Sequence, residues 1–162
     1  MHEEGSDSFF EHSWGNLGQI VLAIAFFAVW LVDAFFLQGT VVDARVSIGV
    51  RLPLAMVNWL AVAYLARQSL RLVFDKTRDP TRVIRESVYG IVRHPLYLSE
   101  MLLYPGFLLC RFSLAACGIW LLGAGFLHIL ARYEEKQLVA RFGEEYHDYM
   151  RDVPMWLPWI WK

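Results

Sequence analysis

Charged residues and cysteines are scarce in this sequence, and each shortage excludes a class of protein. Only 19% of the 162 residues are charged and 57% are hydrophobic, whereas soluble domains carry about 25% charged residues. The two cysteines, Cys110 and Cys117, have neither a Cys-x-x-Cys spacing nor a companion histidine, so we expect no disulfide framework and no metal site. With a net charge of −1, we expect no nucleic-acid partner.

The sequence does contain four long apolar runs. The first, Leu17–Leu37, has one ionisable residue, Asp33, in 21 positions, and a helix of that length spans roughly 32 Å, enough to cross a bilayer core. The other runs cover residues 52–73, 96–109 and 114–130. We therefore predict an all-α integral membrane bundle of about four transmembrane helices. The third, barely long enough to cross, forms a helical hairpin with the fourth, and a helical extension follows in the cytoplasm.

The distribution of Lys and Arg predicts the orientation of this bundle. Seven of these residues lie between Arg67 and Arg93, and five lie from Arg132 onward. Both stretches are therefore expected on the cytoplasmic side, which also places the basic-free N-terminal tail there. Because that tail is acidic, we expect a retained membrane helix rather than a cleaved signal peptide. The expected location is a prokaryotic plasma membrane.

This topology brings two polar stretches, 74–97 and 128–150, to one face of the membrane. In the first stretch, Pro95 suits the first turn of a helix, because the missing N–H of proline would be unpaired there anyway. His94 then lies at the helix cap, beside free backbone N–H groups that attract anions. The sequence predicts a water-accessible hollow that both stretches line.

An acidic residue, Glu100, lies within the third apolar run. A carboxylate is costly in the membrane and usually faces a cavity or a partner. At helical spacing Glu100 shares a face with Tyr97 and Tyr104. It either serves the site or only pairs with an arginine such as Arg67 or Arg71, and the sequence leaves both interpretations open.

The fourth predicted helix continues beyond the membrane as a charged helix to Phe142, where Gly143 can end it. His128, Arg132 and Glu135 fall on one stripe of this helix, and Glu134 lies on an adjacent face. Charged helices of this kind are most often solvated surfaces, but this one leaves the bilayer opposite His94. The tail beyond Val153 has three tryptophans, Trp156, Trp159 and Trp161, a pattern typical of anchoring at the headgroup level.

These motifs together resemble a known family over residues 81–158. The motif Arg93-His94-Pro95-x-Tyr97 is followed about forty residues later by Glu134-Glu135, Phe142-Gly143, Tyr146, Tyr149 and Val153-Pro154. This order resembles the membrane methyltransferases that include isoprenylcysteine carboxyl methyltransferases and phospholipid N-methyltransferases. The resemblance implies S-adenosylmethionine as methyl donor and S-adenosylhomocysteine as product, with no strand–glycine–helix unit of the Rossmann kind.

The resemblance also implies roles for individual residues. It assigns the cofactor to Arg82, Val83, Ile84, Tyr89, His94, Pro95, Leu96, Tyr97, Glu134 and Glu135. The catalytic candidates are Arg93, Glu100, His128 and Arg132: His128 or Glu100 would act as general base for an amine acceptor, and an arginine would hold an anionic one. The expected acceptor is a lipid or another lipophilic small molecule that enters sideways from the membrane lipids. Residues 1–162 would form one domain, with two membrane helices in 1–74 and the catalytic core in 75–162.

The sequence departs from the family pattern at two positions. Ser87 stands two residues before the aromatic Tyr89, where family members usually carry glycine. Leu130 stands four residues before the matched glutamate, where eukaryotic carboxyl methyltransferases place a substrate-binding arginine, and the nearest arginine here is Arg132. The identity of the acceptor and the oligomeric state stay open.

Two other functions remain alternatives. A membrane reductase related to the sterol reductases would bind NADPH and would need extra cations near its phosphate, which Lys76, Arg78, Arg82 and Arg85 could supply. A non-catalytic membrane adaptor would use the charged helix as a docking surface. The adaptor hypothesis predicts that His94→Ala and Glu134→Ala leave the chain folded and functional.

Overall fold

The computed structural model describes residues 4–41, 46–75, 77, 79 and 81–157, with residues 4–14 described as backbone only. The regular secondary structure of this part of the chain is helical, apart from an isolated β-bridge between Val41 and Ser113. The helices are α1 (Glu4–Val32), α2 (Ile48–Val73), α3 (Pro95–Cys110), α4 (Leu114–Phe142) and α5 (Glu144–Asp152), with a π-helical turn η1 (Asp33–Leu37) and a 3₁₀ turn η2 (Ser87–Gly90). The predicted all-α membrane bundle is confirmed.

Among the residues that the structure describes, three helices are long and apolar enough to cross a membrane. They comprise residues Gly15–Leu37, Ile48–Val73 and Leu114–Phe142. The third predicted crossing, α3, has 16 residues and is therefore about 24 Å long, shorter than a bilayer core. It forms the predicted hairpin with α4. Of the four predicted crossings, three are therefore long enough to span a bilayer, and α3 is a shorter apolar helix packed among them.

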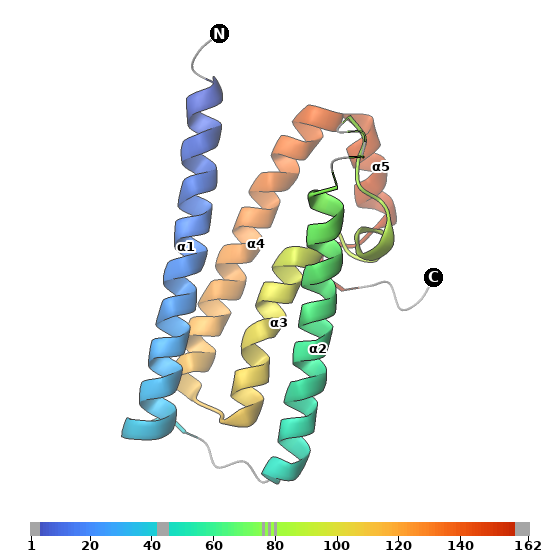
Figure 1. Ribbon diagram of the computed structural model, residues 1–162. Coiled ribbons are helices and arrows are strands. Elements are labelled where there is room, and N and C mark those ends of the chain that lie inside the picture. Colours follow the sequence, from blue (N-terminus) through green and yellow to red (C-terminus); the bar gives the residue numbers. More distant parts are fainter. Residues whose placement is uncertain (1–3, 42–45, 76, 78, 80, 158–162) are drawn as a thin grey trace.

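The helices lie side by side in the order α1, α4, α3, α2 (Figure 1). Contacts between α2 and α3 are the most extensive, and α1 packs mainly on α4. The chain then folds back at Gly143, whose φ of 59° lies in the left-handed region that glycine adopts at low cost. This turn, which the sequence predicted as the end of the helix, places α5 beside the loop that follows α2.

A proline inside α3 is compensated by a neighbouring helix. Pro105 has no N–H, so the carbonyl of Met101 four residues earlier lacks its usual helical partner. The indole N–H of Trp120 on α4 donates to that carbonyl at 2.9 Å. From the other side, Asn58 Nδ2 on α2 donates to the carbonyl of Leu102 at 2.8 Å. These side-chain hydrogen bonds hold α3 between α2 and α4.

The close contact between α2 and α3 depends on a glycine. A Cβ atom added at Gly106 would lie 2.2 Å from Nε1 of Trp59, whose indole donates to the carbonyl of Leu103. We expect Gly106→Ala to lower the free energy of unfolding by about 1–3 kcal/mol, as overpacked cores do. Thermal unfolding in detergent measures this. The matched control is Gly123→Ala on α4, where an added Cβ meets nothing within 4 Å, and an equal loss in both variants would contradict the explanation.

The only acidic residue in the apolar part of α1 and η1 has a structural role. Asp33 is 6% exposed, and its carboxylate accepts hydrogen bonds from the backbone N–H and the hydroxyl of Thr40, at 3.0 and 2.6 Å. Thr40 Oγ1 in turn accepts from the backbone N–H of Ala115 at 3.0 Å. The network therefore joins the start of η1, through Thr40, to the first turn of α4, at the end of the bundle away from the His94 turn.

Candidate functional site

The site is built on the turn that leads into α3. As predicted, Pro95 occupies the first turn of the helix and His94 is its N-cap residue. Ser87, at the start of η2, has φ of 51°, a left-handed conformation that costs a residue with a side chain about 1–2 kcal/mol. This backbone conformation explains why glycine suits this position in the family that the sequence resembles.

The C-terminal segment fixes this turn in place. The backbone N–H of Arg93 donates to the carbonyl of Pro154 at 2.9 Å, and its guanidinium donates to the carbonyl of Met150 at 3.2 Å. The hydroxyl of Tyr149 on α5 donates to the carbonyl of Tyr89 at 2.7 Å. Residues about sixty positions apart in sequence therefore hold each other in a defined arrangement.

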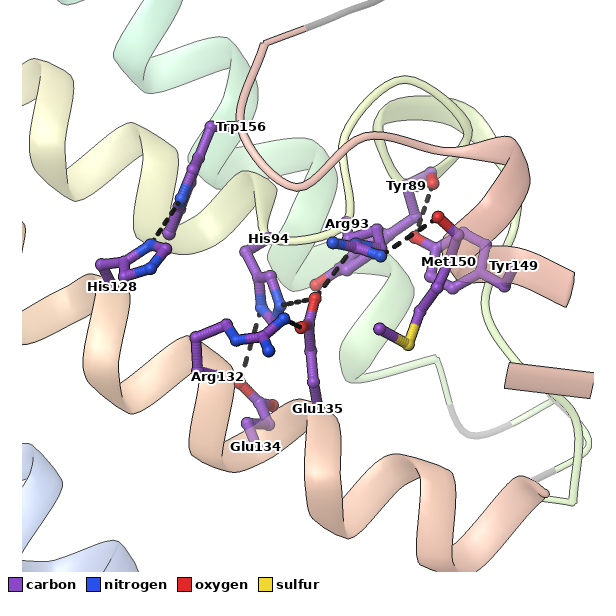
Figure 2. A network of polar contacts seen from close by, with 10 residues as sticks. All are labelled: Tyr89, Arg93, His94, His128, Arg132, Glu134, Glu135, Tyr149, Met150 and Trp156. Atoms are coloured by element: carbon purple, nitrogen blue, oxygen red, sulfur yellow. Dashed lines mark hydrogen bonds and ion pairs between the residues drawn. The ribbon is translucent and has the colours of Figure 1, made fainter. Parts of the chain in front are cut away.

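A buried carboxylate on α4 holds the turn from the other side. Glu135 is 2% exposed, and its Oε1 lies 3.0 Å from Nε of Arg93 and 3.3 Å from Nε2 of His94. Its second oxygen accepts a hydrogen bond from Arg132 at 3.3 Å. Figure 2 shows these groups converging on Glu135. An ion-paired carboxylate satisfied on both oxygens can stay charged at this depth.

His94 lies between two carboxylates. Its Nδ1 is 3.7 Å from Oε2 of Glu134, on the opposite side of the ring from Glu135. The imidazole stacks on the ring of Tyr97, with centroids 5.7 Å apart and planes 12° apart. His94 is 6% exposed whereas the side chain of Glu134 is 41% exposed, so Glu134 is the carboxylate that faces open space.

A cavity of about 470 Å³ opens beside these residues, a size within the roughly 300–1,000 Å³ of small-molecule sites. Three carboxylates and three arginines line it among the described residues, together with His94 and several aromatic rings. Burial raises the pKa of two of the lining phenols, Tyr146 and Tyr149. The lining residues are Leu72, Val73, Asp75, Asp79, Arg82, Val83, Ile84, Tyr89, Arg93, His94, Leu96, Tyr97, Glu134, Leu138, Arg141, Phe142, Tyr146 and Tyr149.

The predicted convergence of the two polar stretches is present. Of the residues to which the sequence gave a catalytic or cofactor-binding role, nine line the cavity: Arg82, Val83, Ile84, Tyr89, Arg93, His94, Leu96, Tyr97 and Glu134. Two others, Pro95 and Glu135, do not line the cavity but lie next to residues that do. Pro95 is buried in the first turn of α3, and Glu135 binds the back of the His94 turn rather than facing the cavity.

Three catalytic candidates lie outside this cavity. Glu100 lines a separate small hollow between α1, α3 and α4, beside Tyr104 and Phe126. In the described part of the chain no ion pair joins Glu100 to Arg67 or Arg71, and both arginines are exposed. The structure therefore places Glu100 outside the cavity that His94 lines. The other two candidates, His128 and Arg132, lie on α4 at the side of His94.

Several lining residues had no role assigned from the sequence. Leu138 and Arg141 follow Glu134 at spacings of four and seven, so the helical period alone could have predicted them. Tyr146 and Tyr149 belong to the recognised motif but had no assigned role. Asp79, whose pKa is lowered by the hydroxyl of Thr81, lies in an irregular loop that has no such periodicity.

The tail contributes one residue to the site beyond its expected anchoring role. The indole N–H of Trp156 donates to Nδ1 of His128 at 3.1 Å, and its ring centroid lies 5.8 Å from that of His94. Figure 2 shows Trp156 between the two histidines. The other tail residues, Trp159 and Trp161, and the loop cations Lys76 and Arg78 lie outside the described residues.

The chain is similar to bacterial proteins named methanethiol S-methyltransferase. It is 32% identical over 91 residues to one from Crocosphaera subtropica, covering 54% of this chain and 34% of the relative. It is 34% identical over 73 residues to one from Mycobacterium tuberculosis, covering 44% and 29%. A methanethiol S-methyltransferase 2 from Bradyrhizobium diazoefficiens is 37% identical over 78 residues, covering 44% and 27%.

These similarities are partial in extent. The matched region spans about a third of the length of the curated relatives. No known protein-family model matches the chain, and no solved structure matches it. The comparisons therefore show that part of this helical membrane chain is similar to part of proteins named as methyltransferases.

Proposed function

We propose that the chain is an integral membrane methyltransferase that uses S-adenosylmethionine as donor. The observation that carries this proposal is the cavity that His94 and Glu134 line together, where the turn before α3 meets the end of a membrane helix. The similarity to three methanethiol S-methyltransferases supports the reaction class. The cavity faces the cytoplasm in this proposal, in agreement with the Lys and Arg distribution.

The lining of the cavity fits this donor. S-adenosylmethionine carries a carboxylate, an ammonium, a sulfonium and an adenosine, and it supplies an activated methyl group. Among the described lining residues, three carboxylates balance three arginines, which suits a ligand bearing charges of both signs. Aromatic rings such as Tyr97 suit the adenine and the sulfonium.

Each group of residues has a physical role in the proposal. Glu134 accepts hydrogen bonds from the ligand's ammonium or hydroxyl groups, because its carboxylate is half exposed to the cavity. The stretch Arg82–Ile84 forms the outer wall, and Val83 is fixed there because its N–H donates to Glu145 at 3.1 Å. Glu135 keeps Arg93 and His94 in position, so that the donor and the acceptor meet already aligned. Such alignment is worth about 7–11 kcal/mol in favourable cases.

The acceptor we propose is an apolar thiol, by analogy with the named activity of the relatives. Incubation of purified protein with labelled S-adenosylmethionine tests this, with methanethiol and longer alkanethiols in one arm and a total lipid extract in the other. Label in the thiols is the expected result. Label only in the lipids would move the acceptor to the membrane, and label in neither would contradict the proposed reaction.

The balance of charges among the described lining residues gives no support to the reductase alternative. NADPH carries several phosphate charges and would need an excess of cations, whereas the described lining has equal numbers of arginines and carboxylates. A ligand stabilises only the folded state it binds. We therefore expect S-adenosylhomocysteine, but not NADPH, to raise the melting temperature of the protein in detergent, and the reverse result would favour the reductase.

A further inference from the structure

His128 and Trp156 form a hydrogen-bonded pair beside the cavity, on α4 and the tail. The indole Nε1–H of Trp156 points to Nδ1 of His128 at 3.1 Å (Figure 2). An indole nitrogen can only donate, so Nδ1 must be the acceptor and carries a lone pair. The neutral imidazole then has its proton on Nε2. Trp156 therefore fixes His128 as a hydrogen-bond donor at Nε2 and occupies the nitrogen that could act as a base.

The surroundings of this pair suit an anion with an apolar body. His128 is exposed, and Arg132, one turn further along α4, keeps 56% of its side chain exposed although it donates to Glu135. The neighbours Ile129 and Leu157 are exposed apolar side chains, at 69% and 77%. One cation and one N–H donor are thus close in sequence to exposed hydrocarbon side chains.

The pair is also connected to the cavity. The ring of Trp156 contacts both His128 and His94, with centroids 6.1 and 5.8 Å apart. His94 stacks on Tyr97, and both of these residues line the cavity. An acceptor held at His128 would therefore lie next to a ligand in the cavity, on the side of His94 that Trp156 covers.

We infer that His128, with its tautomer fixed by Trp156, and Arg132 hold the methyl acceptor as an anion, and that His128 does not act as a general base. The inference rests on the proposed function. A thiol loses its proton to solvent, and Nε2–H of His128 and the guanidinium of Arg132 stabilise the resulting thiolate. The thiolate sulfur then forms a bond to the methyl carbon as the bond from that carbon to the sulfonium sulfur breaks. The electron pair of the broken bond stays on the donor sulfur, so two neutral thioethers result.

Replacing His128 by an amide side chain tests whether this residue acts as a hydrogen-bond donor or as a general base. Glutamine places an N–H near the position of Nε2, asparagine places it near Nδ1, and neither can accept a proton at neutral pH. We expect His128→Ala and His128→Asn to lower kcat/KM for an alkanethiol by about 10- to 100-fold, the value of a hydrogen bond to a charged group. His128→Gln should recover most of this loss. If glutamine is as inactive as alanine, His128 is a base and the inference is wrong.

Trp156→Phe tests the role of the indole N–H, because phenylalanine keeps an aromatic ring beside His94. Trp156→Phe should lower kcat/KM in the wild-type background but not in the His128→Ala background, since it acts through that histidine. An equal loss in both backgrounds would contradict the inference.

The ¹⁵N chemical shifts of His128 give a readout that does not depend on activity. In the wild-type protein in detergent, Nδ1 should be unprotonated and Nε2 protonated, and Trp156→Phe should convert this state to a mixture of tautomers. A protonated Nδ1 in the wild-type protein would overturn the inference. Calorimetry with S-adenosylhomocysteine distinguishes a failure of the proposed function from a failure of this inference. If the wild-type protein does not bind S-adenosylhomocysteine, the proposed function is contradicted. If the inference is correct, the His128 and Trp156 variants bind S-adenosylhomocysteine as the wild-type protein does.

Discussion

Replacing Glu135 by alanine is expected to lower the free energy of unfolding by about 3–5 kcal/mol, the usual result of removing one member of a buried ion pair. Glu135 is 2% exposed, and the guanidinium of Arg93 that it binds at 3.0 Å is only 10% exposed. Without the carboxylate, Arg93 would retain a buried charge with no counter-ion. Denaturant titration of the purified protein in detergent micelles measures the loss.

An exposed ion pair provides the control for this prediction. Arg85 and Asp152 approach to 3.6 Å, but both side chains are more than a third exposed. Asp152→Ala should therefore lower the free energy of unfolding by no more than about 1 kcal/mol. Glu135→Gln, which keeps the shape and removes the charge, should fall between the two. If Glu135→Ala is as stable as Asp152→Ala, the carboxylate does not hold the turn before α3.

Replacing Glu134 by glutamine is expected to weaken S-adenosylhomocysteine binding by about 10- to 100-fold and to leave stability unchanged. The reason is that a charge-assisted hydrogen bond contributes about 1.5–3 kcal/mol, whereas a side chain that is 41% exposed contributes little to the core. Calorimetric titration of the variant measures the affinity. Replacement of Glu134 should therefore weaken ligand binding without loss of stability, whereas replacement of its neighbour Glu135 should lower the free energy of unfolding.

Glu144→Gln is the matched control for the binding experiment. Glu144 is an exposed carboxylate in the first turn of α5 and does not line the cavity. Its replacement makes the same change in charge and should leave the affinity as in the wild-type protein. Equal affinities for the Glu134 and Glu144 variants would contradict the assignment of Glu134 to the ligand. Such a result would also favour the adaptor hypothesis, under which Glu134→Ala leaves the function intact.

The sequence predicted those features that depend on local chemistry or on topology. Hydropathy and turn residues predicted the hairpin of α3 and α4, Pro95 marked the start of one helix, and Gly143 marked the end of the other. The number of crossings and the hairpin placed both polar stretches at one end of the bundle. The meeting of His94 with Glu134 followed from that placement, because His94 precedes α3 and Glu134 lies in the part of α4 at the same end of the hairpin.

The sequence could not predict which of two adjacent glutamates faces the cavity. Glu134 and Glu135 lie about 100° apart around a helix, and the rotation of α4 is set by the packing of Arg93 and His94 against it. Glu100 raised the same difficulty, because its place beside Tyr104 and Phe126 depends on how α1 and α4 pack against α3.

The position of Trp156 was also beyond sequence reasoning. A tail rich in tryptophan is compatible with any position at the membrane surface, and its aromatic residues do not indicate a partner. Trp156 reaches His128 because the backbone N–H of Arg93 binds the carbonyl of Pro154. That contact joins segments about sixty residues apart, and neither the periodicity nor the composition of the tail indicates it.

Calorimetric titration of the purified wild-type protein with S-adenosylhomocysteine tests the central claim most directly. If the cavity beside His94 and Glu134 is the donor site, the titration will show saturable binding of one ligand per chain in a detergent that keeps the helical bundle folded. A folded protein that shows no heat of binding in several such detergents, at more than one temperature, would contradict the claim.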